Sequence, residues 1–192
     1  MTENLKNMYV NDDRGYFSLD ELSRLKEMLK DNYLHMLWFK MLYMLGITAS
    51  ELINIRVKDV ETDHRKLHLH SSRKLKERVL EIPESIVPDI RAEICQRDTG
   101  DFLFSGRNGK LHPRTIQKLI EKLEKGSGQR ISIAKLRRTL AFHMLDDGWD
   151  EKKVAYYLGH NSLRSTRRLL GDYQKYLYLN RHPYEKISVN AA

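Results

Sequence analysis

The stretch that decides the fold is NYLHMLWFKMLYML, residues 32–45, which runs directly into GITASEL, residues 46–52. Residues 32–45 are apolar on almost every side, a pattern typical of a helix buried on all faces. Gly46 suits the left-handed residue that commonly follows a helix C-terminus. The sequence therefore predicts a central buried helix that ends at Gly46, followed by a short helix over about residues 50–55.

Working outward, the flanking patterns predict further helices and one hairpin. Ser18 and Glu21 form a capping box before leucines at helical spacing. Residues 66–70 and 78–82 alternate in period two around a polar, basic turn at 71–77, as in a β-hairpin. Helical patterns then cover 87–96, 113–125, 132–145, 150–158 and 162 to about 178. We expect a mainly α fold with a small antiparallel β-sheet.

Length and composition restrict the class of protein. The chain has 192 residues, 41% of them hydrophobic, which fits one domain with a real core. Cys95 is its only cysteine, which excludes an internal disulfide framework and favours a reducing, cytoplasmic setting. No apolar run reaches the roughly 18 residues that span a bilayer, and residues 1–15 do not resemble a signal peptide.

The basic excess is confined to the second part of the chain. Residues 1–104 carry 16 Lys and Arg against 18 Asp and Glu, whereas residues 105–192 carry 18 against 8. The later bases cluster at residues 135–138 and 164–168. A solvated basic face and a surface for a phosphate backbone both fit this pattern.

An ordered set of motifs resembles the catalytic domain of tyrosine recombinases, the phage-integrase and Xer-like family. The match covers roughly residues 16–178 and includes the buried helix, the hairpin and two late motifs. The matching segments are FSLDEL at 17–22, MLYMLGITASEL at 41–52, KLKERV at 74–79, LFS at 103–105, LRRTLA at 136–141 and LGHNS at 158–162 with Thr166.

The resemblance implies a chemistry without metal or cofactor. In this family a tyrosine attacks a DNA phosphodiester to form a 3′-phosphotyrosyl link, arginines and a histidine hold the phosphate oxygens, and a hairpin lysine acts as general acid. The matching positions are Arg137, His160 and, on the hairpin, Lys74, with Tyr173 as candidate nucleophile. A different gap in the turn would place the hairpin lysine position at Arg73. The residues expected to contact DNA are Arg73, Lys76, Arg138, Arg164, Arg167 and Arg168.

Four positions depart from the family pattern. The first catalytic arginine falls at Thr48, the first histidine at Ala134, the second histidine at Arg138, and the in-register tyrosine at Leu169. Tyr173 lies one helical turn later and either enters the site, because Gly171-Asp172 breaks the helix, or packs the C-terminal helix. Catalytic residues act as a unit, so these losses favour a degenerate member with impaired or absent strand cleavage.

The expected domain order is a lead-in at 1–16, a catalytic-like domain at 17–178 and a tail at 179–192. The family usually adds an N-terminal clamp domain before the catalytic domain, so the sequence is expected to be either a standalone domain or a fragment. Expected partners are double-stranded DNA and an active recombinase, or a second copy bound through the tail. The setting would be cytoplasmic and nucleoid-associated, and the protein would act in recombination, integration or its regulation.

An active enzyme using Tyr173 and a basic protein–protein interaction module are the alternatives. The imidazoles of His64, His68 and His70 offer too few ligands for zinc.

Overall fold

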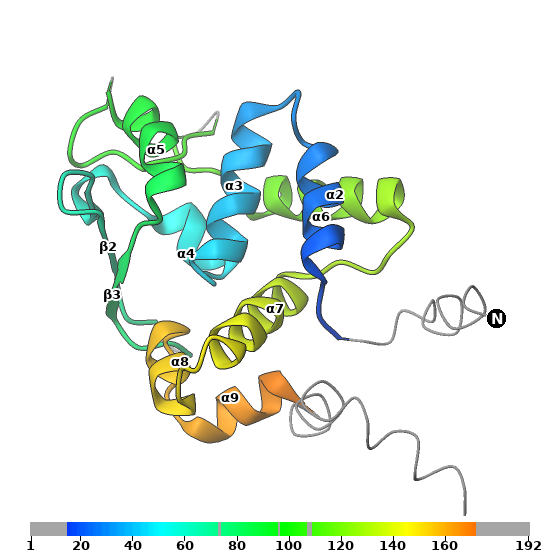
Figure 1. Cartoon of the computed structure of the whole chain (residues 1–192). Coiled ribbons are helices and arrows are strands. Elements are labelled where there is room, and N and C mark those ends of the chain that lie inside the picture. Colours follow the sequence, from blue (N-terminus) through cyan, green and yellow to red (C-terminus); the bar gives the residue numbers. More distant parts are fainter. Residues whose placement is uncertain (1–14, 73, 96, 107–108, 172–192) are drawn as a thin grey trace, which may run out of the picture.

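The buried helix organises the fold. The computed structural model describes residues 15–72, 74–95, 97–106 and 109–171 (Figure 1). Helix α3 (Tyr33–Met44) starts at the Asn32 N-cap and buries Leu37, Phe39, Met41 and Leu42 completely. Helix α2 (Leu19–Glu27) precedes it and starts at the expected capping box of Ser18. The prediction of a central buried helix is confirmed.

The expected hairpin forms, and one short strand joins it. Helix α4 (Ala49–Asn54) and a 3-10 turn at Val57–Asp59 lead into β1 (Val60–Glu61), β2 (Lys66–Leu69) and β3 (Arg78–Glu81). The three strands are antiparallel in the order β1-β2-β3. At two residues, β1 is too short to show an alternating pattern, so only the hairpin was predictable.

The later helices complete the expected order. They are α5 (Val87–Ile94), α6 (Pro113–Ser127), α7 (Ile133–Asp146), α8 (Glu151–Tyr157) and α9 (Leu163–Leu170). The last helix was expected to extend to about residue 178, and this prediction of its length was wrong. Helix α9 ends at Leu170, because Gly171 follows with φ +58°. Residues 172–178 lie outside the described part of the chain.

Two neighbouring hydrophobic clusters make up the core. The larger one surrounds α3 and takes side chains from α2, α4, the sheet, α5 and α6. The smaller one joins α7, α8 and α9 and includes Phe142, Val154, Leu158 and Leu170. In Figure 1, α8 and α9 lie below α7, and the lower end of the β2–β3 hairpin reaches α8. The fold therefore brings the hairpin tip to the segment that carries His160.

Candidate nucleic-acid interface

Arg137 is a buried arginine that ties three segments together. It lies on α7 and is 5% exposed. Its Nη1 donates to the carbonyl of Gly46, and its Nη2 donates to the carbonyl of Leu158 at 3.1 Å. Burial lowers the pKa of Arg137 to about 10, so the guanidinium stays charged at neutral pH. The side chain is therefore held in one orientation by backbone acceptors at the ends of α3 and α8.

His160 lies against Arg137. Nη2 of Arg137 is 3.2 Å from its Nε2, and its Nδ1 is 2.9 Å from Oγ1 of Thr166. Burial, followed by the charges of Arg137, Arg78 and Arg168, lowers the pKa of His160 to about 4. The ring is therefore neutral at pH 7. Because a guanidinium only donates, Nε2 accepts and Nδ1–H donates to Thr166.

The hairpin tip is fastened beside this histidine by backbone contacts. The N–H of Lys76 donates to the carbonyl of Gly159 at 2.9 Å, and Leu75 forms an isolated β-bridge with His160. Nδ2 of Asn161 donates to the carbonyl of Lys74 at 3.2 Å. Lys74 and Lys76 are both exposed. The hairpin thus presents two lysines next to the segment that follows α8.

A basic pocket lies between this tip and α9. Its volume is about 310 Å³. Its lining residues, which define the basic pocket, are Lys74, Leu75, Arg138, His160, Ser165, Arg168 and Leu169. Lys74, Arg138 and Arg168 supply cations from three different elements, and no carboxylate is among the lining residues. An opening of this composition attracts anions such as phosphate.

The structure brings together some of the other predicted residues and separates others. Arg138 donates to the carbonyls of Leu169 and Gly15, which joins α7 to the end of α9 and to the start of the described chain. Arg167 pairs with Glu151 at 3.0 Å, facing α8. Arg164 is exposed and is not among the residues lining the basic pocket. Arg73 and the candidate nucleophile Tyr173 lie outside the described residues.

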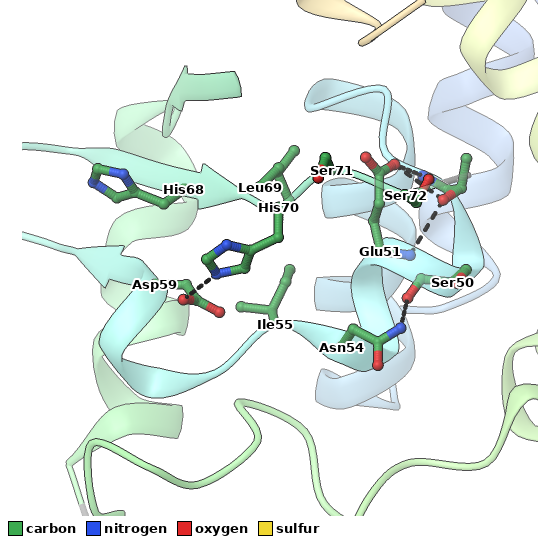
Figure 2. A pocket seen from close by; sticks show the side chains of 11 residues that line it. Ser50, Glu51, Asn54, Ile55, Asp59, His68, Leu69, His70, Ser71 and Ser72 are labelled. Atoms are coloured by element: carbon green, nitrogen blue, oxygen red, sulfur yellow. Dashed lines mark hydrogen bonds and ion pairs between the residues drawn. The ribbon is translucent and has the colours of Figure 1, made fainter. Parts of the chain in front are cut away.

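Thr48 stands at the start of α4 and caps it. The hydroxyl of Thr48 accepts from the N–H of Glu51 at 3.2 Å, and Oε2 of Glu51 accepts from the N–H of Thr48 at 2.8 Å. Both residues line a second cavity of about 190 Å³, in which Figure 2 shows His70 pointing to Asp59. Nε2 of His70 is 2.8 Å from Oδ1 of Asp59. The position that the resemblance assigns to an arginine therefore serves here as a helix cap.

Arg78 is a site neighbour that motif matching did not single out. Its side chain is 0% exposed, and Nη1 lies 2.6 Å from Oε1 of Glu51. The alternation of residues 78–82 carries the signal, because it places Arg78 on the same face as the buried Leu80 and Ile82. An arginine at an inward strand position indicates a buried ion pair. Finding its partner required the tertiary structure.

Two histidines of the described part of the chain pair with carboxylates. Among the described residues, no group of three or more His, Cys, Asp or Glu is arranged to hold a metal ion. His68 instead faces Glu61 at 2.5 Å, and His70 faces Asp59. Within the same described ranges, no helix is long and apolar enough to cross a bilayer.

A mainly helical domain in which a hairpin brings a lysine beside an Arg–His pair has the layout of a tyrosine-recombinase catalytic domain. Residues 16–174 match the Phage integrase family, and the chain belongs to that family.

Among its relatives, the tyrosine recombinase XerA of Thermococcus onnurineus is 32% identical over 134 residues, which are 67% of this chain and 48% of that protein. The tyrosine recombinase XerC of Neisseria gonorrhoeae is 31% identical over 157 residues, 77% of this chain and 51% of that protein. The chain thus spans about half the length of these relatives.

Solved structures share the fold. The crystal structure of XerA recombinase superposes with a TM-score of 0.74 at 23% identity, covering 86% of this chain and 64% of that one. The XerH site-specific recombinase bound to a palindromic difH substrate gives 0.72 at 19% identity, covering 88% and 53%. The tyrosine-recombinase fold expected from the sequence is confirmed.

Proposed function

We propose that this protein binds double-stranded DNA through the basic pocket and has lost strand cleavage, acting in DNA recombination, integration or its regulation. The proposal rests on the observation that Leu169 lines the basic pocket together with His160. The resemblance expects the nucleophilic tyrosine at that position. We assign this role to the domain at residues 17–178. We place the protein in a cytoplasmic, nucleoid-associated setting.

Charge and fold support DNA as the ligand. Residues 105–192 carry a net charge of +10, and the pocket gathers Lys74, Arg138 and Arg168 without a lining carboxylate. Neutralising phosphates with such side chains releases counterions and favours binding. Among structures that share the fold, the Tn1549 transposon integrase has been solved in complex with transposon right end DNA, and XerH bound to its difH substrate.

The composition of the site argues against cleavage. Thr48 is a short cap where the family pattern calls for a guanidinium, and an alkyl side chain stands at 169. Removing one donor from a transition state typically costs about 3–4 kcal/mol, and residues that act as a unit retain little when several are missing. A neutral His160 whose Nε2 already accepts from Arg137 has no free donor on that nitrogen.

A nicked suicide duplex tests the proposal directly. We expect no covalent protein–DNA adduct from the wild-type chain, although the same duplex shifts in a gel. An adduct that disappears in Tyr173→Phe would instead establish an active integrase-type enzyme and overturn the loss of cleavage. Leu169→Tyr is the matched variant, since it returns a phenol to the pocket without changing the net charge. We expect it to form no adduct either, because Thr48 still leaves the catalytic set incomplete.

The macromolecular partners follow from the same proposal. A DNA-binding member without cleavage would act beside an active recombinase, or beside a second copy engaged through the tail at 179–192. That tail lies outside the described residues. If no duplex DNA shifts at any salt concentration, the basic half is instead a protein-interaction surface.

A further inference from the structure

The buried ion pair between Arg78 and Glu51 lies next to the turn that carries His160. The two side chains are 0% and 7% exposed. Burying both charges carries a large desolvation cost, so such a pair is weak evidence for stability alone. The role of the ion pair is therefore better inferred from what it contacts than from its contribution to stability.

The guanidinium of Arg78 contacts three elements at once. Nη1 meets Glu51 at the start of α4, and Nε donates to the carbonyl of Tyr157, the last residue of α8, at 2.7 Å. Nη1 also lies 3.4 Å from the carbonyl of Lys76 in the hairpin itself. One side chain thus joins α4, the end of α8 and the hairpin.

Gly159 lets this guanidinium lie against the turn that carries His160. A Cβ on Gly159 would lie 2.8 Å from Cζ of Arg78, closer than real Cβ contacts come. Gly159 also has φ +70°, which disfavours any side chain there. The absence of a side chain at 159 is therefore a condition for the contact with Arg78.

The backbone contacts between the hairpin and the turn lie directly beyond this anchor. The N–H of Lys76, two residues before Arg78, donates to the carbonyl of Gly159 at 2.9 Å. The Leu75–His160 bridge comes next, and then the bond from Asn161 to the carbonyl of Lys74. These contacts follow one another along the hairpin from Arg78 to Lys74, which lines the basic pocket.

We infer that Arg78 is a positioning residue that clamps the hairpin tip to the Gly159–His160 turn, so that Lys74 and His160 face one anion site. The inference rests on the proposed DNA-binding function and assigns the geometry of its pocket to a residue that touches no ligand. Glu51 supplies the counter-charge. Its Oε2 is occupied by Thr48 and its Oε1 by Arg78.

Arg78→Lys separates clamping from charge. A lysine keeps a cation beside Glu51 but has no planar fork to reach the carbonyl of Tyr157 at the same time. We expect about a tenfold weaker affinity for a mixed-sequence 30-base-pair duplex at 50 mM salt, measured by fluorescence anisotropy. Leu123→Ala, a core truncation on α6, is the control for lost stability and should leave this affinity unchanged.

Two further measurements report on the clamp locally. In Arg78→Lys the amide of Lys76 should lose its protection against hydrogen exchange. The pKa of His160, followed by NMR, should rise from about 4 towards its ordinary value as the turn opens. The Leu123→Ala control should leave both at their wild-type values.

The possible outcomes are distinguishable. Wild-type affinity together with a protected Lys76 amide in Arg78→Lys overturns the inference. If the wild-type chain binds no DNA, the proposed function fails, and the Lys76 exchange and His160 titration still decide whether Arg78 clamps the turn. Should Arg78→Lys not fold, the exposed Asn161→Ala removes the outermost contact and should weaken binding about two- to threefold. Unchanged affinity in Asn161→Ala would then count against the clamp.

Discussion

At the scale of single residues, Gly46 shows how a sequence signal and a packing constraint coincide. Its φ of +58° requires the left-handed region, as the helix C-terminus predicted. A Cβ there would also lie 2.7 Å from Cδ2 of Leu140 and 2.8 Å from Cδ2 of Leu158. In addition, its carbonyl accepts from Arg137. Substitution therefore disturbs both the backbone and the contacts that orient Arg137.

We expect Gly46→Ala to lower the free energy of unfolding by about 3 kcal/mol, the sum of left-handed strain and overpacking. Gly148→Ala is the matched control, because Gly148 has φ +89° but open space where a Cβ would be. That variant should cost only about 1 kcal/mol from strain. Urea denaturation of both variants measures the difference, and equal losses would show that Leu140 and Leu158 adjust freely.

The depressed pKa of His160 makes stability depend on pH in a defined direction. The folded ring titrates near pH 4 and the unfolded ring near 6.5, so the unfolded state binds more protons between these values. The contribution of the neutral His160 ring to the free energy of unfolding is complete above pH 6.5 and is lost as the pH falls towards 4. Burial, and then the charges of Arg137, Arg78 and Arg168, oppose the charged ring, and Glu51 favours it.

We expect His160→Gln to reduce the loss of unfolding free energy between pH 7 and pH 4.5 by about 2 kcal/mol. Burial also lowers the pKa of His35 and His143, so some pH dependence will remain. His64→Gln, at an exposed position, serves as the control. Urea midpoints at both pH values report the effect, and parallel curves for wild type and His160→Gln would contradict it.

The residues of the site differ in how well the sequence predicts them. Arg137 and His160 were found because they stand in short ordered motifs, and the structure places them 3.2 Å apart. The burial of Arg137 was not predictable, since its acceptors at Gly46 and Leu158 come from distant parts of the chain. The roles of both residues towards phosphate stay a prediction.

At the scale of elements, the signals that worked were periodicity and capping. Asn32, Ser132, Asp150 and Ser162 cap α3, α7, α8 and α9 with their side chains, so these helix starts lie close to the expected positions. The C-terminal end of α9 was misplaced because apolar spacing continues beyond Gly171 in the sequence. The backbone at Gly171 ended the helix there.

Two adjacent arginines on α9 face different neighbours. Arg168 lines the basic pocket, whereas Arg167 pairs with Glu151 of α8. We expect Arg168→Ala to weaken binding of duplex DNA about five- to tenfold at 100 mM salt and to reduce the salt slope by about one. Arg167→Ala removes the same charge and should change affinity less than twofold. Anisotropy titrations compare the two, and equal losses would mean that α9 acts only through its net charge.

At the scale of the whole molecule, the asymmetry of charge and the fold have to be considered together. The net charge of +8 says only that some polyanion is favoured. The fold gives that charge a location, because the hairpin from the near-neutral first part meets α7 and α9 from the basic second part at one pocket. No short stretch of sequence indicates that the hairpin, α7 and α9 come together, because their proximity depends on the packing of α8 against β3.

The salt dependence of DNA binding is the property that follows from this arrangement. Four exposed cations belong to the hairpin tip and α9 without a carboxylate partner among the ion pairs of the described residues: Lys74, Lys76, Arg164 and Arg168. If each neutralises one phosphate, the slope of log affinity against log salt is roughly −3.6, and affinity falls about 150-fold between 50 and 200 mM. The double variant Lys74→Ala/Lys76→Ala should reduce that slope by about two. The control variant Lys26→Ala/Lys30→Ala removes the same charge from the last turn of α2 and from the turn that follows it. Helix α2 lies away from the hairpin in Figure 1, so this variant should leave the slope unchanged. A slope that responds equally to both double variants would show diffuse attraction by the whole chain, whereas a difference confined to the hairpin places the phosphate backbone at the pocket.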